Sequence, residues 1–183
     1  MLNPSPPSPP TATSEAPTNP GQLLFFSDSK QNMLTCYYFN AQSIVNKICE
    51  LHYILYHVAP DCVLVTESWL NADVCDGLLD PKSLYTVIRK DRVGCRGGGV
   101  CALVKRSHSV LPLTFHEKYS ELEIVGFDFV GGRPALRIFV VYRPHTMTVL
   151  SHLMLSYSLN VSLSTPIIIN ICISLSVILI YPI

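Results

Sequence analysis

One carboxylate stands where a metal site could form. Glu67 follows directly after the apolar run Cys62-Val63-Leu64-Val65-Thr66, which has the length of a strand buried on both faces. A carboxylate held at the end of such a strand faces the sheet edge, and hard oxygen ligands there suit Mg²⁺. The alternative is a solvated glutamate that begins a loop. Asn40 ends another predicted strand, where asparagine is also an ordinary turn residue, and Tyr142 could equally be a core aromatic with its hydroxyl at the rim.

Three short motifs appear in order between residues 39 and 144: Phe39-Asn40, then Thr66-Glu67-Ser68-Trp69-Leu70, then Val140-Val141-Tyr142-Arg143-Pro144. Together they resemble the endonuclease/exonuclease/phosphatase superfamily, most closely the endonuclease domain at the N-terminal end of non-LTR (long interspersed element) retrotransposon polyproteins. The resemblance implies Mg²⁺-dependent nicking of DNA, with no small-molecule cofactor. It also implies that Glu67 binds the metal that polarises the scissile phosphate, that Asn40 helps orient the metal-bound phosphate, and that Tyr142 lies near it.

The second half of that family's active site has no counterpart in the sequence. The family supplies a Gly-Asp-x-Asn motif after a later strand and a Ser-Asp-His motif near the domain's end. Here Pro166-Ile167-Ile168-Ile169 resembles the preceding strand, but Ile171 and Ile173 stand at the expected Asp and Asn, and the chain ends before Ser-Asp-His. Hydrolysis needs these further groups as well as a metal ligand. We therefore expect an inactive fragment of the endonuclease, or alternatively a DNA-binding remnant or a membrane-associated fragment.

Basic residues gather between residues 82 and 106, with Asp91 as the only acidic residue among them. Such a run could neutralise several DNA phosphates and give salt-dependent affinity. The alternative is a solvated charged hairpin, which is consistent with the formal net charge of +0. The predicted DNA-binding residues are Arg89, Lys90, Arg92, Arg96, Lys105 and Arg106.

The apolar spacing predicts elements that could position these residues. A helix over 43–57 would begin at Ser43 as N-cap and stop at Ala59-Pro60, between strands over 33–40 and 62–66. Two hairpins should follow, the first with the Gly97-Gly98-Gly99 run in its connection and the second with a half-exposed first strand. Their strands are expected over 84–89, 100–104, 122–130 and 136–142. This order is that of an α+β fold, and the resemblance implies an incomplete four-layer α/β/β/α sandwich of the deoxyribonuclease I-like type.

Composition divides the chain into three parts. Residues 1–30 are rich in Pro, Ser and Thr and are expected to be disordered. The resemblance implies that residues 31–145 form a partial endonuclease-like domain. Residues 146–183 carry no formal charge, and decayed coding, a membrane segment over 166–183 or buried sheet could each account for them. The seven scattered cysteines support neither a zinc site nor a disulfide framework. We expect a nuclear or cytoplasmic protein, with a membrane location as the alternative.

Overall fold

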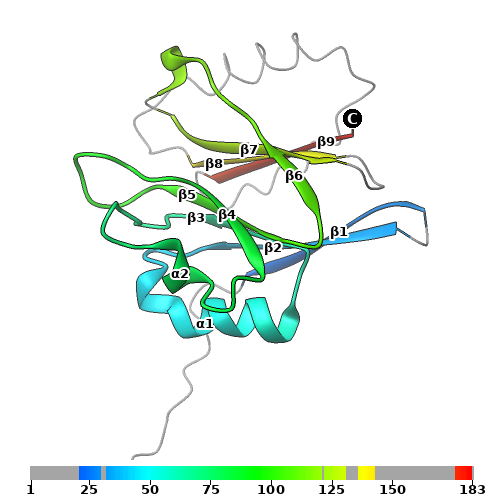
Figure 1. Cartoon of the computed structure of the whole chain (residues 1–183). Helices are drawn as coiled ribbons and strands as arrows, with labels where there is room; N and C mark the ends of the chain where they lie inside the picture. Colours follow the sequence, from blue (N-terminus) through cyan, green and yellow to red (C-terminus); the bar gives the residue numbers. More distant parts are fainter. Residues whose placement is uncertain (1–20, 30–31, 121, 131–135, 143–175, 183) are drawn as a thin grey trace, which may run out of the picture.

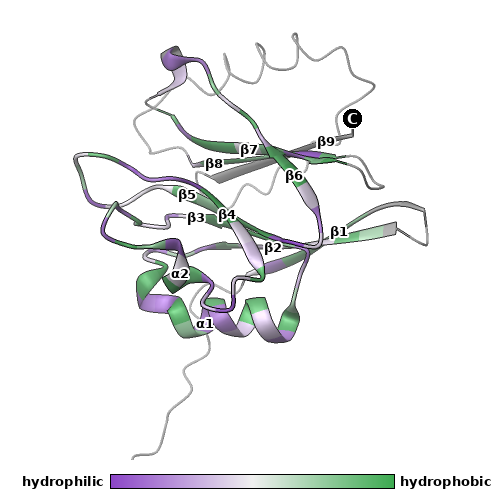
Figure 2. Ribbon diagram, in the orientation of Figure 1, coloured by the Kyte–Doolittle hydropathy of each residue, from purple (hydrophilic) through white to green (hydrophobic). Residues whose placement is uncertain are grey.

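Two β-sheets lie face to face, and a helical segment covers the outer face of one of them (Figure 1). The computed structural model describes residues 21–29, 32–120, 122–130, 136–142 and 176–182. The chain is therefore of the mixed α+β class, as the sequence predicted. Figure 2 shows that the strands are mainly apolar, while the helical segment carries apolar and polar residues in alternation.

The first sheet, sheet A, contains five strands in the order β1-β2-β3-β5-β4. Only β2 and β3 are parallel among its neighbouring strands, since the crossover between them passes through the helical segment. The strands predicted over 33–40, 62–66, 84–89 and 100–104 are all confirmed. Their observed bounds are β1 Gln22–Ser29, β2 Asn32–Asn40, β3 Cys62–Thr66, β4 Tyr85–Lys90 and β5 Val100–Lys105.

The predicted helix is present but composite. A 3₁₀ turn, Val45–Lys47, leads into α1, Ile48–Tyr53, and then into a π-helical turn, Ile54–Val58. Ala59 ends the helical segment in the left-handed conformation at φ 49°, so the stop predicted at Ala59-Pro60 is confirmed. Ser43 is not the N-cap: its φ is 88°, and its N–H donates to the carbonyl of Glu67 at 3.0 Å. The chain is therefore bound to the β3 end before the helix begins.

The second sheet, sheet B, is antiparallel in the order β6-β7-β8-β9. The predicted strands over 122–130 and 136–142 are confirmed as β7 and β8. However, β7 is not half-exposed, because every residue of it except Val130 is buried. The bounds are β6 Ser109–Pro112, β7 Glu123–Val130, β8 Leu136–Tyr142 and β9 Ser176–Pro182. Two short helical elements, α2 Asp76–Leu79 and the 3₁₀ turn Glu117–Tyr119, complete the described structure.

Two hydrophobic clusters hold these layers together. Between the sheets, Tyr38 and Leu64 of sheet A pack in one buried cluster with Phe127 and Ile138 of sheet B. On the outer face of sheet A, a second cluster joins strand residues such as Val63 to the helical segment. Burial of apolar side chains at about 25 cal/mol per Å² is the main stabilising contribution to such layers. The described residues thus form three layers: helix, sheet A and sheet B.

The expected boundaries of the domain are wrong at both ends. Residues 22–29, assigned to the disordered segment 1–30, form β1 and pair with β2, because Leu24 and Phe26 pack against the inter-sheet cluster. In the uncharged region 146–183, residues 176–182 form β9 beside β8. A strand there disagrees with a helical membrane span over 166–183. Across the described part of the chain, no helix is long and apolar enough to cross a membrane. Residues 1–20 and 143–175 lie outside the described residues.

Candidate functional site

The ends of the two parallel strands bring Asn40 and Glu67 to the same edge of sheet A. Asn40 is the last residue of β2 and is in register with Thr66, the last residue of β3. Beyond the strands, the N–H of Ala41 donates to the carbonyl of Thr66 at 2.8 Å, so the two chains leave the sheet side by side. The sequence predictions that Asn40 ends a strand and that Glu67 follows directly after a buried strand are confirmed.

The carboxylate of Glu67 is held in a fixed orientation by two donors. Its Oε2 accepts hydrogen bonds from the indole Nε1 of Trp69 at 2.6 Å and from the backbone N–H of Gly98 at 2.8 Å. Both Glu67 and Trp69 have positive φ, 54° and 53°, which costs energy for residues other than glycine. Backbone strain of this kind concentrates at functional sites. Two hydrogen bonds therefore hold one carboxylate oxygen of Glu67 in place.

The glycine run explains how the β4–β5 connection reaches Glu67. Gly98 and Gly99 have φ of 67° and 80°, so the predicted positive-φ turn is confirmed. A methyl group at Gly98 would lie 2.3 Å from the guanidinium of Arg92, so a side chain here would displace Arg92. The carbonyl of Gly98 also accepts from the N–H of Trp69 at 2.9 Å. Close approach, as well as turning, thus requires glycine here.

A partly buried ion pair joins this connection to sheet B. Glu123, the first residue of β7, bonds the Nε of Arg92 through Oε1 and the backbone N–H of Gly99 through Oε2, the latter at 2.5 Å. Burial would lower the pKa of Arg92, but the hydrogen bond to Glu123 and its negative charge outweigh this and raise that pKa. Sequence reasoning missed Glu123. Its signal was a carboxylate opening an otherwise apolar strand, which is uncommon unless the charge is paired.

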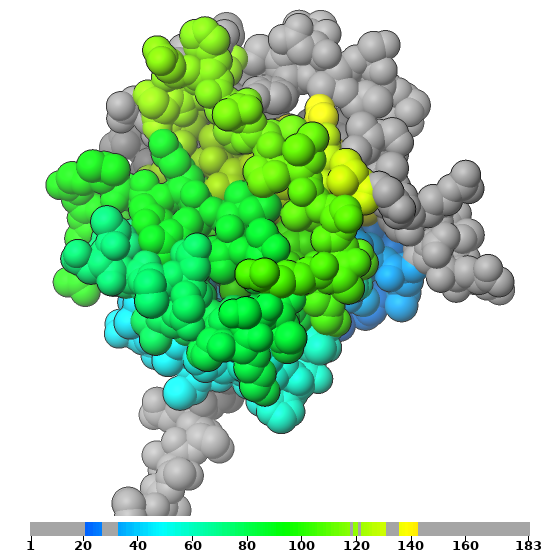
Figure 3. Space-filling model, in the orientation of Figure 1, coloured from blue at the N-terminus to red at the C-terminus, as the bar shows by residue number. Residues whose placement is uncertain are grey.

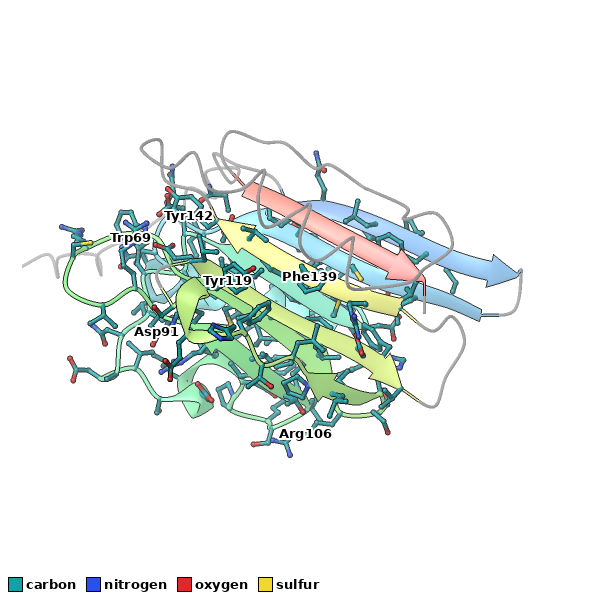
Figure 4. All side chains as sticks on the ribbon, turned by 90° about the horizontal axis from the view of Figure 1, so that it is seen from above. Trp69, Asp91, Arg106, Tyr119, Phe139 and Tyr142 are labelled. Carbon is teal, nitrogen blue, oxygen red and sulfur yellow. The ribbon has the colours of Figure 1, made fainter. Side chains whose placement is uncertain are left out.

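Tyr142 joins the same end of the molecule from the other sheet. It is in register with Glu123 on the neighbouring strand, and its ring lies 5.7 Å from the guanidinium carbon of Arg92. Figure 4 shows Tyr142 and Trp69 at the same end of the two sheets. The structure therefore brings the three residues singled out in the sequence, Asn40, Glu67 and Tyr142, to one end of the sandwich.

A buried acceptor without a partner lies at this end. The Oδ1 of Asn40 is buried and has no hydrogen-bond partner among the described residues. Such an atom costs free energy unless something satisfies it. Mg²⁺ is often held by only one or two carboxylates, with water and phosphate completing its shell, so Asn40 and Glu67 are of the types that suit it. No cluster of three or more His, Cys, Asp or Glu residues able to hold a metal occurs in the described part of the chain.

The predicted basic patch divides into separate groups. Arg89 bonds the carboxylates of Asp76 and Asp91 at 3.2 and 3.4 Å, so its charge is satisfied internally. Lys105 and Arg106 lie at the opposite end of the β4–β5 pair from Lys90, because Tyr85 is in register with Lys105 and Lys90 with Val100. Their side chains donate to backbone carbonyls, Lys105 to Ala59 and Arg106 to Tyr85. A single DNA-binding surface made of all six predicted residues therefore does not form.

Arg92 and Arg96 instead line a cleft beside Glu67. The cleft has a volume of about 710 Å³ and is bounded by three connections: residues 43–46, 69–74 and 92–97. Trp69 forms part of its wall, and the guanidinium carbon of Arg96 lies 5.2 Å from the centre of the Trp69 rings. In Figure 3 the connection after β4 projects from the left side of the molecule. The cleft combines an aromatic surface with positive charge.

The sequence matches no protein-family model, and no curated protein matches it.

Proposed function

We propose that this chain is an endonuclease/exonuclease/phosphatase-type domain of the retrotransposon kind, that it binds Mg²⁺ and a DNA phosphodiester at the Asn40–Glu67 edge, and that it does not hydrolyse the bond. The observation that carries the proposal is the convergence of Asn40, Glu67 and Tyr142, which are far apart in sequence, at one end of the two sheets. Asn40 and Glu67 come from sheet A, whereas Tyr142 comes from sheet B.

The layers are compatible with the four-layer sandwich that the resemblance implies. Helix, sheet A and sheet B follow the expected α/β/β order, and the parallel β2–β3 pair presents its carboxyl ends to the site. A helical layer on the outer face of sheet B would complete the deoxyribonuclease I-like arrangement. Within the described ranges no α-helix follows α2 along the chain. We therefore propose the deoxyribonuclease I-like fold type together with the function.

Glu67 and Asn40 would hold the metal. Glu67 offers Oε1, because Oε2 already accepts from Trp69 and Gly98, and Asn40 offers its unpaired Oδ1. When bound, Mg²⁺ would neutralise negative charge on a phosphate oxygen. Tyr142 and Arg92 would bind and orient the phosphate, since a guanidinium and a phenol are hydrogen-bond donors at neutral pH. Arg92 is fixed for this role by its ion pair with Glu123.

Hydrolysis needs groups that the described residues of this site do not supply. A proton acceptor or water-orienting group must lie on one side of the phosphate and a leaving-group donor on the other. No Asp or Glu follows Asp128 in the sequence, and Ile171 and Ile173 stand at the positions where the resemblance expects Asp and Asn. These two isoleucines lie outside the described residues. Binding without cleavage is therefore the activity that the residues support.

A nicking assay tests the proposal. Purified protein and its Glu67→Ala variant are incubated with supercoiled plasmid and Mg²⁺, and the conversion to open circles is measured. We expect both to nick at the same background rate, while wild-type protein retains plasmid in a gel-shift assay. Nicking by wild-type protein clearly above that of Glu67→Ala would refute the loss of hydrolysis, and the absence of DNA binding would refute the proposed function as a whole.

A further inference from the structure

The side chain of Trp69 is oriented for a task beyond the stabilisation of its own loop. Its Nε1 is fixed by Glu67 Oε2 at 2.6 Å, while the rings form part of the cleft wall. The guanidinium of Arg96 lies over these rings, 5.2 Å from their centre. Arg96 itself is exposed and belongs to a connection whose residues 93–96 are all exposed. Arg96 therefore covers an aromatic surface that it can also uncover.

The cleft matches the size and chemistry of a nucleotide. Its volume of about 710 Å³ exceeds the space that one base needs, and Trp69 supplies a flat apolar surface on which any base can stack. Two cations, Arg92 and Arg96, line the same cleft, and the amide side chains of Asn46 and Asn71 lie among its walls. Aromatic surface combined with positive charge is the chemistry of single-stranded nucleic-acid binding.

We propose that this cleft binds an unpaired base of single-stranded nucleic acid, which stacks on Trp69 in place of Arg96, while Arg96 moves to the neighbouring phosphate. The inference rests on the proposed function, since it assumes that the phosphodiester lies at Glu67. The hydrogen bond between Trp69 and Glu67 places the stacking surface next to the phosphate site. A base inside a duplex presents no free face, so single strands should bind more tightly than blunt duplex.

The test uses a probe that the chain already contains, because Trp69 is its only tryptophan. A short oligothymidylate is titrated into the protein and tryptophan fluorescence is recorded, because a stacked base quenches the indole. The comparison ligand is an abasic oligonucleotide of the same length, which carries the same phosphates without bases. We expect the oligothymidylate to quench Trp69 and to bind about 5- to 150-fold more tightly than the abasic strand, the range that one stacked base contributes.

Variants separate stacking from charge, with binding followed by anisotropy of a labelled oligonucleotide. Trp69→Leu should weaken binding of the oligothymidylate but not of the abasic strand, whereas Trp69→Phe should retain most of the difference. Arg96→Ala should lower the slope of log K against log salt by about 0.7 for a single strand. The matched control is Lys82→Ala, because Lys82 lies over the ring of Tyr56 at 4.0 Å and lines another part of the surface. This control should bind as wild-type.

The outcomes are distinguishable. If both oligonucleotides bind equally and Trp69 fluorescence is unchanged, the stacking inference is wrong while the proposed phosphate site stands. If neither binds, the proposed function fails and this inference fails with it. If blunt duplex binds more tightly than the single strand, the cleft does not take an unpaired base. Because the abasic comparison uses wild-type protein, the inference stays testable even where Trp69→Leu does not fold.

Discussion

The Arg92–Glu123 ion pair gives the sharpest stability prediction. The change is Glu123→Gln, which preserves the side-chain shape but replaces two carboxylate acceptors with one amide oxygen and one amide N–H₂. The side chains of Arg92 and Glu123 are 20% and 9% exposed, so water cannot fully compensate for the lost bond. In the variant, either the Nε–H of Arg92 or the N–H of Gly99 must face the new amide N–H₂, which is itself a donor.

The expected loss follows from these contacts. A hydrogen bond to a charged group contributes about 1.5–3 kcal/mol, and an unsatisfied buried donor costs about 1–3 kcal/mol. Since Arg92 retains some access to solvent, we expect Glu123→Gln to lower the free energy of unfolding by about 2–4 kcal/mol. In a double-mutant cycle with Arg92→Met, the coupling free energy should be at least about 1.5 kcal/mol. Equilibrium unfolding in urea measures both quantities.

A second ion pair of similar burial supplies the control. Asp128 and Arg137 on β7 and β8 are joined at 2.6 and 2.8 Å, with side chains that are 10% and 19% exposed. Asp128→Asn should also destabilise the protein, but it should leave Trp69 fluorescence and oligonucleotide binding unchanged. Glu123→Gln should alter both. A coupling free energy below about 0.5 kcal/mol, or equal effects of the two variants on Trp69, would refute the role assigned to Glu123.

Three further predictions concern the loop, a thiol and acid stability. Gly98→Ala should weaken oligonucleotide binding, because its methyl group would lie 2.3 Å from the Arg92 guanidinium and displace it. Gly94→Ala, at φ 84° but with open space around it, should lower only the free energy of unfolding, by about 1–2 kcal/mol, as a urea titration can measure. Alkylation of the exposed Cys95, which lines the cleft, should slow when oligonucleotide binds, and that of the exposed Cys49 on α1 should not, as mass spectrometry can measure. Burial raises the pKa of Asp61, but hydrogen bonds from neighbouring side-chain and backbone donors lower that pKa by more. The net pKa of Asp61 is therefore below its ordinary value. The contribution of Asp61 to stability should therefore be complete above the unfolded-state pKa of about 3.9 and should be lost as the pH falls through the lower folded-state pKa. In acid unfolding curves, the free energy of unfolding of Asp61→Asn should therefore decline less steeply than that of wild-type protein.

The elements that position Glu67 could be predicted because their signals are local. A continuous apolar run ends at Thr66, and a helical period separates it from the preceding strand, which predicts a strand, a helix and a second strand. The structure shows that the two strands are parallel, with Asn40 at the same edge. The glycine run was equally readable, since three successive glycines indicate a turn with positive φ. In each case a few neighbouring residues carry the information.

The parts that were missed depend on pairing between distant segments. β9 pairs with the edge of β8, which is distant in sequence. The uncharged sequence around β9 has no periodicity that distinguishes a strand from other apolar segments. The proline-rich composition before β1 predicts disorder and obscures the apolar residues around Phe26. Glu123 opens an apolar strand, but the local sequence does not indicate its partner, because Arg92 lies 31 residues away. Ser43 has the residue type of a cap, but its N–H bonds Glu67 instead.

The most direct test of the central claim is whether Mg²⁺ strengthens DNA binding through Glu67. A labelled duplex with an unpaired thymidine overhang is titrated with wild-type protein and with Glu67→Gln, each with Mg²⁺ and with a chelator, at constant ionic strength. The proposed site predicts tighter binding with Mg²⁺ for wild-type protein and no response to Mg²⁺ for Glu67→Gln, because the amide retains an oxygen for Trp69 and Gly98 but loses the charge that attracts the metal. An equal response of both proteins to Mg²⁺, or no binding by either, would contradict the assignment of this edge as a metal and phosphate site.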